Sequence, residues 1–158
     1  LFAKACTDVS KDYPDIKFEE MYVDACAMNL IRQPEKFDVV VTTNLFGDIL
    51  SDESSQVVGG LGMAPAANLG DDFALFEPVH GAAFDIAGQN IANPSSFLLS
   101  IKMMLDWLGT KHNDQKCFEM ATKLESTIFN LVKSGIKTKD IGGDVTTTEF
   151  TKQITDNL

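Results

Sequence analysis

The chain has 158 residues, about the length of one domain, and 44% of them are hydrophobic, so it can bury a sizeable core. Its formal net charge of −10 would repel phosphate backbones, which argues against nucleic-acid binding. No apolar run is long enough to predict a membrane span, and no signal peptide is visible. The cysteines Cys6, Cys26 and Cys117 follow no zinc or redox spacing, so we expect reduced thiols in a cytosol-like compartment.

Predicted helices and strands alternate along the chain. Helices are expected where apolar residues recur at helical spacing, and strands at short apolar or β-branched runs. The expected helices are 1–12, 25–33, 45–58, 95–108, 113–134 and 146–156, and the expected strands are 17–23, 37–42 and 73–76. Residues 60–72 have the composition of a loop. This alternation predicts an α/β fold with a parallel or mixed sheet flanked by helices.

Residues at the expected helix ends support several of these elements. Asn44 suits an N-cap, Pro94 suits a helix start, and the threonines 146–148 suit the cap of the last helix. The first predicted helix begins at residue 1 with no capping residue before it. We therefore expect residue 1 to lie inside or at the edge of a helix whose upstream sequence is missing here; the alternative is a complete domain that is only trimmed at its start.

An acidic pair lies in the sequence NLFGDILSD, residues 44–52. Asp48 and Asp52 are four residues apart on a predicted helix and share one face, where a bound cation would offset their repulsion. Asp24 and Asn44 follow predicted strands, and ligands of open α/β sheets lie outside the carboxyl ends of strands. Three aspartates with no nearby cysteine or histidine suit Mg²⁺ or Mn²⁺. The alternative interpretation is a set of solvated surface acids.

The segment FEPVHGAAFDIAGQNIANP, residues 76–94, is almost uncharged and rich in glycine and alanine. A buried Asp85 would need a partner, and a ribose diol could be that partner. The backbone N–H groups of residues 80–83 could approach a pyrophosphate, and Asn93 could read an adenine edge. A 2′-phosphate about 4 Å from Asp85 would meet repulsion of about 4 kcal/mol per charge pair at an effective dielectric of 20, which favours NAD over NADP. The alternative is a loop that packs against its own protein.

Four motifs together resemble the isocitrate/isopropylmalate dehydrogenase family. They are YVDACAM (22–28), FDVVVTTNLFGDILSD (37–52), FEPVHGAAFDIAGQNIANP (76–94) and DIGGDVTTTEF (140–150). The resemblance covers essentially the whole chain in order, and the two middle motifs are long and specific. It implies the C-terminal part of an isopropylmalate dehydrogenase-like fold.

The resemblance also implies the roles of individual residues. Asp48 and Asp52 of one subunit and Asp24 of the partner would hold the divalent metal and, through it, the substrate, so a homodimer would share each active site. The loop would bind NAD, with Glu77 near the nicotinamide, Asp85 and Ile86 at the adenosine ribose, and Ala92 and Asn93 by the adenine. The expected cofactor contacts are Asn44, Glu77, His80, Gly81, Ala82, Ala83, Asp85, Ile86, Ala92 and Asn93.

The activity implied is NAD-dependent oxidative decarboxylation of 3-isopropylmalate or isocitrate, with Mg²⁺ or Mn²⁺. Homoisocitrate or tartrate dehydrogenase activity and a non-catalytic regulatory subunit are the alternatives, and the three retained aspartates argue against the regulatory one. The family's arginine cluster, active-site tyrosine and catalytic lysine would lie upstream of residue 1, which agrees with the single arginine, Arg32. We therefore expect this chain alone to be inactive, and we expect a cytoplasmic protein, or a mitochondrial-matrix one in a eukaryote.

Overall fold

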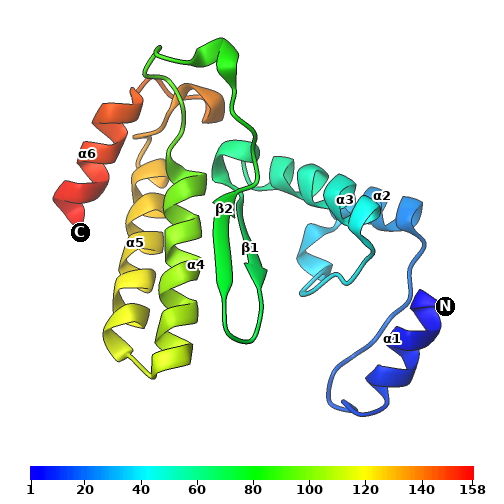
Figure 1. Cartoon of the computed structure of the whole chain (residues 1–158). Helices are drawn as coiled ribbons and strands as arrows, with labels where there is room; N and C mark the ends of the chain where they lie inside the picture. Colours follow the sequence, from blue (N-terminus) through cyan, green and yellow to red (C-terminus); the bar gives the residue numbers. More distant parts are fainter. The chain divides into compact units, whose positions relative to one another are not determined.

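The computed structural model describes all residues from 1 to 158 (Figure 1). The chain forms two compact units, Leu1–Glu53 and Ser54–Leu158. The regular structure consists of six α-helices, four short 3-10 helices and two strands. No helix is both long and apolar enough to cross a membrane.

The first unit contains α1 (Phe2–Ser10), α2 (Val23–Arg32) and most of α3 (Asn44–Val57). Its small core joins Cys26 and Leu30 of α2 to Leu50 of α3. Cys26 and Leu30 are four residues apart, so one face of α2 carries both into the core. Burial raises the pKa of the Cys26 thiol, and the Glu53 carboxylate raises it further. Cys26 therefore acts here as a packing residue.

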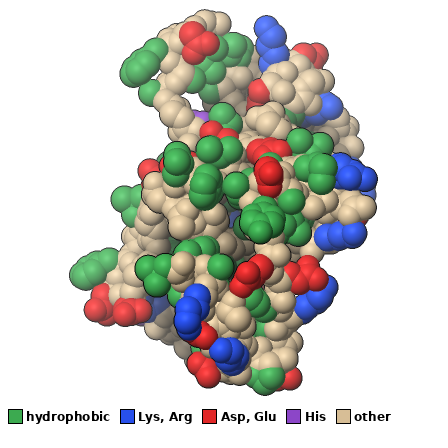
Figure 2. Space-filling view, turned by 90° about the vertical axis from the view of Figure 1, so that its right-hand side faces the viewer, with side chains coloured by type: hydrophobic (Ala, Val, Ile, Leu, Met, Phe, Trp, Pro, Cys, Tyr) green, Lys and Arg blue, Asp and Glu red, His purple; other side chains and the backbone are tan.

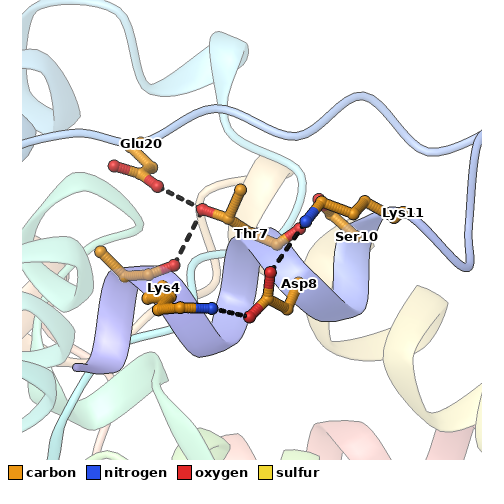
Figure 3. Close-up of polar contacts among 7 residues, drawn as sticks. Lys4, Thr7, Asp8, Ser10, Lys11 and Glu20 are labelled. Atoms are coloured by element: carbon orange, nitrogen blue, oxygen red, sulfur yellow. Dashed lines mark hydrogen bonds and ion pairs between the residues drawn. The ribbon is translucent and has the colours of Figure 1, made fainter.

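Polar contacts dominate around α1, which has no buried residue (Figure 3). The carboxylate of Asp8 accepts hydrogen bonds from Lys4 and, at 2.8 Å, from Lys11. Both hydrogen bonds lower the pKa of Asp8, and the bond from Lys11 has the larger effect. The hydroxyl of Thr7 donates to the carboxylate of Glu20, which ties α1 to the segment that follows it.

The strands expected at 17–23 and 37–42 are not formed. Residues 15–22 and 39–43 are irregular, and the side chains of Val39 and Val41 are 83% and 69% exposed. Strand propensity alone does not make a strand, because its backbone groups must pair with a neighbouring strand. The described chain supplies no such neighbour to these segments. Hydrophobic side chains therefore lie at the surface among acidic and basic ones, as Figure 2 shows for one face.

The second unit begins with an antiparallel ribbon of β1 (Pro65–Leu69) and β2 (Ala74–Pro78). Pro65 pairs with Pro78 and Leu69 with Ala74. The prediction of a loop over 60–72 is wrong for β1. Its sequence PAANL has no β-branched residue that would indicate a strand, and the extended backbone is stabilised by pairing with β2. Strand β2 confirms the strand expected at 73–76, although it begins at Ala74 and ends at Pro78.

Three helices complete the second unit: α4 (Ser95–His112), α5 (Gln115–Lys133) and α6 (Thr147–Asn157). Helices α4 and α5 lie side by side, and α4 packs against both strands (Figure 1). The core between the helices is formed by Met63, Leu99, Leu124, Ile128, Leu131, Phe150 and Ile154. Phe150 and Ile154 come from one face of α6, so burial of that face anchors the C-terminal helix.

Two buried serines of α4 fix the ribbon in place. The hydroxyl of Ser96 donates to the carbonyl of Ala64, next to β1, and that of Ser100 donates to the carbonyl of Glu77 in β2 at 2.8 Å. Both serines are at most 2% exposed. A buried hydroxyl that satisfies a strand carbonyl fixes the distance between helix and strand as well as the register.

The α/β class is confirmed, and the six helices fall where the sequence predicts helices. The sheet differs from the expected parallel or mixed one, since the chain forms a single two-stranded antiparallel ribbon. The cap at the last helix is also confirmed. Thr146 accepts from the amide of Glu149, and the Glu149 carboxylate accepts from the amide of Thr146.

Candidate functional sites

The acidic pair lies on α3, as the sequence predicts. Asp48 and Asp52 belong to the same helix, four residues apart, and both are exposed. They therefore present carboxylates on one helix face. Asp24 lies in the first turn of α2, and its carboxylate accepts a hydrogen bond from the amide of Ala25 at 2.7 Å. Asn44 is the first residue of α3, rather than the cap that precedes it.

The three aspartates do not gather within one chain. No group of three or more histidine, cysteine, aspartate or glutamate side chains in the chain could hold a metal ion. The pair on α3 still fits a hard divalent cation by its chemistry, because two carboxylates supply oxygen ligands only. A single copy of the chain therefore does not bring together the three aspartates that were expected to hold a metal.

The start of the glycine–alanine loop is held by the β-ribbon and α4. The amide of Val79 donates to the carbonyl of Ala64 at 3.3 Å, extending the ladder past β2. The Glu77 carboxylate accepts from the side-chain amide of Asn68 in β1 at 3.1 Å. With the bond from Ser100, both the backbone and the side chain of Glu77 are fixed. The sequence did not reveal this contact between Asn68 and Glu77.

The middle of the loop, 80–89, is exposed apart from Ile86. His80 Nδ1 lies 2.9 Å from the carbonyl of Gly81, and Ala83 has a left-handed backbone with φ 42° before the short turn Phe84–Ile86. The amides of Gly81 and Ala82 take no part in the hydrogen bonds of this loop.

Asp85 corrects one expectation. The sequence predicts a buried carboxylate in need of a partner at this position, but Asp85 is exposed. Its backbone carbonyl accepts from the side chain of Gln89 at 2.7 Å. Desolvation therefore does not force a ligand onto this carboxylate, and any role with a ribose rests on its position in the loop.

The end of the loop is bonded to the C-terminal segment 138–148. Asn93 is the clearest case, because its side-chain amide donates to Asp140 at 3.0 Å and to the sulfur of Met63 at 3.5 Å. Its carbonyl oxygen accepts from the amide of Ser95, the first residue of α4, at 3.0 Å. The amide expected to read an adenine edge is thus already engaged within the protein. The carboxylate of Asp140 also accepts from the hydroxyl of Thr138 at 2.6 Å.

These features describe an α/β chain with an acidic pair on one helix and a glycine–alanine loop between a strand and a helix. The model of the isocitrate/isopropylmalate dehydrogenase family matches residues 1–157, and the chain belongs to that family. This is a family of dehydrogenases, that is, of oxidoreductases.

The relatives that match this chain are named for more than one substrate. The chain is 51% identical to a 3-isopropylmalate dehydrogenase of Sulfurisphaera tokodaii, over 100% of this chain and 47% of that protein. It is 49% identical to an isocitrate/homoisocitrate dehydrogenase of Thermus thermophilus, over 100% of this chain and 45% of that protein. The crystal structure of isocitrate dehydrogenase from Methylococcus capsulatus is similar with a TM-score of 0.91 and 40% identity, over 99% of this chain and 45% of that one. The chain thus spans about half the length of these relatives.

Proposed function

We propose that the natural protein containing this chain is an NAD-dependent, metal-dependent dehydrogenase that oxidises and decarboxylates 3-isopropylmalate or isocitrate. The observation that carries the proposal is the exposed pair Asp48 and Asp52 on one face of α3, in a chain of this family. In the reaction, a hydride passes from the hydroxyl-bearing carbon to NAD⁺, and the β-carboxylate leaves as CO₂. The products are a 2-oxo acid, CO₂ and NADH.

The metal would be held by Asp48 and Asp52 of one subunit and Asp24 of the partner. When bound, Mg²⁺ or Mn²⁺ supplies Lewis-acid chemistry at the substrate oxygens. The chain's own part is to hold a cation and orient the hydroxy acid through it. The proposal therefore includes a homodimer in which Asp24 of one copy meets the acidic pair of the other.

The nucleotide would lie on the segment from Glu77 to Asn93. The exposed Asp85 can accept hydrogen bonds from both hydroxyls of a ribose. Because it is exposed, its repulsion of a 2′-phosphate falls toward the bulk-water value of about 1 kcal/mol per charge pair at 4 Å. The preference for NAD over NADP is therefore expected to be smaller than burial would have given.

Substrate recognition would need residues beyond this chain. A substrate with two or three carboxylates is usually bound by several arginines, and the chain has only Arg32. Relatives named for 3-isopropylmalate and for isocitrate/homoisocitrate are similarly close, so both substrates stay in the proposal. This is also why the chain alone is expected to be inactive.

A regulatory subunit is the second candidate function. It would bind nucleotide without turning over substrate. The three aspartates argue for the catalytic role, because a subunit without turnover does not need a complete set of metal ligands. Mn²⁺ titration separates the two: retained NAD binding with no tight Mn²⁺ binding would favour the regulatory subunit.

The proposal is tested by NADH formation in the natural, full-length protein. The protein is mixed with NAD⁺, Mn²⁺ and, in turn, 3-isopropylmalate, isocitrate, homoisocitrate and tartrate. We expect turnover of one of the first two, abolished by a chelator and by Asp48→Asn. The matched control is Asp15→Asn, which removes an exposed acid outside the proposed site and should leave turnover unchanged. No NADH with any of the four acids would refute the proposed function.

A further inference from the structure

Residues 90–92, near the end of the glycine–alanine loop, are bonded to the first turn of α6. The amide of Thr147 donates to the carbonyl of Asn90 at 2.9 Å, and the hydroxyl of Thr147 donates to the carbonyl of Ala92 at 2.6 Å. The amide and the hydroxyl of Thr148 both donate to the side-chain oxygen of Asn90, at 3.1 and 2.9 Å. Two residues of α6 thus fix this part of the loop by four hydrogen bonds.

This contact follows from the needs of a helix N-terminus. The first amides of a helix have no partner within it. In α6, Thr146 satisfies the amide of Glu149, while Asn90 satisfies the amides of Thr147 and Thr148. The left-handed backbone of Asn90, with φ 56°, is a conformation that asparagine tolerates better than most residues. Asn90 is therefore a cap supplied by a distant part of the chain, and the loop end and the start of α6 stabilise each other.

The middle of the loop has no comparable support. Residues 80–89 form only local hydrogen bonds, such as that from Gln89 to Asp85. A Cβ atom at Gly81 or at Gly88 would meet nothing within 4 Å. The course of this exposed stretch is therefore set by its two fixed ends, β2 on one side and residues 90–93 on the other.

We propose that Thr147 and Thr148 are positioning residues for nucleotide binding, acting through Asn90 and Ala92 on the glycine–alanine loop. The inference rests on the proposed function, because it takes the loop as the nucleotide site. A loop that is held in its binding conformation only part of the time binds more weakly, in proportion to the fraction that is competent. Loss of the Thr148 hydroxyl should lower that fraction without touching the metal ligands.

The test compares three variants of the natural, full-length protein. Thr148→Val removes the hydroxyl that bonds Asn90, and Thr148→Ser restores it. Thr155→Val is the matched control, since it makes the same change on the same helix at a hydroxyl that bonds only Lys152. We measure the Kd for NADH by its fluorescence, kcat at saturating NAD⁺, the Kd for Mn²⁺, and hydrogen exchange of residues 80–94.

For Thr148→Val we expect the Kd for NADH to rise by up to about fivefold, the factor that corresponds to one hydrogen bond. Exchange in 80–94 should be faster, while kcat and Mn²⁺ binding stay unchanged. Thr148→Ser and Thr155→Val should both behave like the wild type. An unchanged Kd, or equal losses of NADH and Mn²⁺ binding, would overturn the positioning role.

A wild-type protein that binds no NADH would refute the proposed function instead. In that case, hydrogen exchange still tests whether the Thr148 hydroxyl holds the end of the loop. Faster exchange of 90–94 in Thr148→Val alone would keep the structural link between α6 and the loop, whereas unchanged exchange would overturn it as well.

Discussion

Replacing Gly62 by alanine should destabilise the protein through a specific collision. A Cβ at Gly62 would lie 2.6 Å from a carboxylate oxygen of Asp140 and 3.0 Å from the Cβ of Asn93. Neither neighbour is the end of a long, flexible side chain. Asp140 accepts from Thr138 at 2.6 Å and from Asn93 at 3.0 Å, so moving it breaks the bond that joins the loop end to the segment 138–143.

The size of the effect follows from two opposing contributions. A hydrogen bond to a charged group is worth about 1.5–3 kcal/mol, and the exposure of Asp140 puts this one at the lower end. Gly62 has no positive φ, so alanine can adopt its backbone conformation. Because alanine also restricts the unfolded chain, this contribution stabilises the folded protein by about 0.4–1 kcal/mol. The net loss should be about 1 kcal/mol.

Gly81→Ala is the matched control, because Gly81 also lacks a positive φ and has no atom within 4 Å of the new Cβ. It should stabilise by about 0.4–1 kcal/mol, the opposite sign. Urea unfolding of the two full-length variants measures the difference. If Gly62→Ala were as stable as Gly81→Ala, the close packing of Gly62, Asn93 and Asp140 would be refuted.

Three further predictions concern the cofactor, the core and acid stability. Replacing Asp85 and Ile86 by lysine and tyrosine should shift the ratio of kcat/KM toward NADP; an unchanged ratio would show that the ribose contact is misassigned. Phe150→Ala, at a side chain with no exposed surface, should cost about 3–5 kcal/mol in urea unfolding, and a loss under about 1 kcal/mol would contradict the packing of α6. Hydrogen bonds from the side chain and the backbone of Thr146 lower the pKa of Glu149, so their stabilisation is present above the ordinary carboxyl pKa of about 4.3 and is lost as the pH falls below it. The stability difference between wild type and Glu149→Gln should therefore shrink on acidification, and a constant difference would refute the capping box.

The helices were predictable because their information is local. Apolar spacing places Cys26 and Leu30 on one face of α2, and capping residues such as Thr146 mark helix starts. Strands depend on partners elsewhere in the chain, so the β-branched run 37–42 is irregular here, while PAANL in β1 forms a strand opposite β2.

The candidate site was predicted in its residue types but not in its contacts. The pairing of Asp48 with Asp52 follows from helical spacing alone. Whether the side-chain amide of Asn93 is available depends on Asp140, which lies 47 positions away in the sequence. Whether Asp85 is buried likewise depends on the tertiary structure. Sequence spacing carries no information about such contacts. The contact between Asn90 and α6 was not predicted, because the sequence shows Asn90 only as one of two asparagines in an almost uncharged loop.

In the proposed metal site, Asp24 of one copy would complete the ligand set begun by Asp48 and Asp52 of another. The most direct test mixes full-length Asp24→Asn subunits with Asp48→Asn subunits and titrates Mn²⁺. Each variant alone should lack tight sites. The mixture should recover about a quarter of the wild-type number, because half of the dimers are hybrids and each hybrid holds one intact site. No recovery on mixing, or full Mn²⁺ affinity in either variant alone, would contradict a metal site shared between two copies.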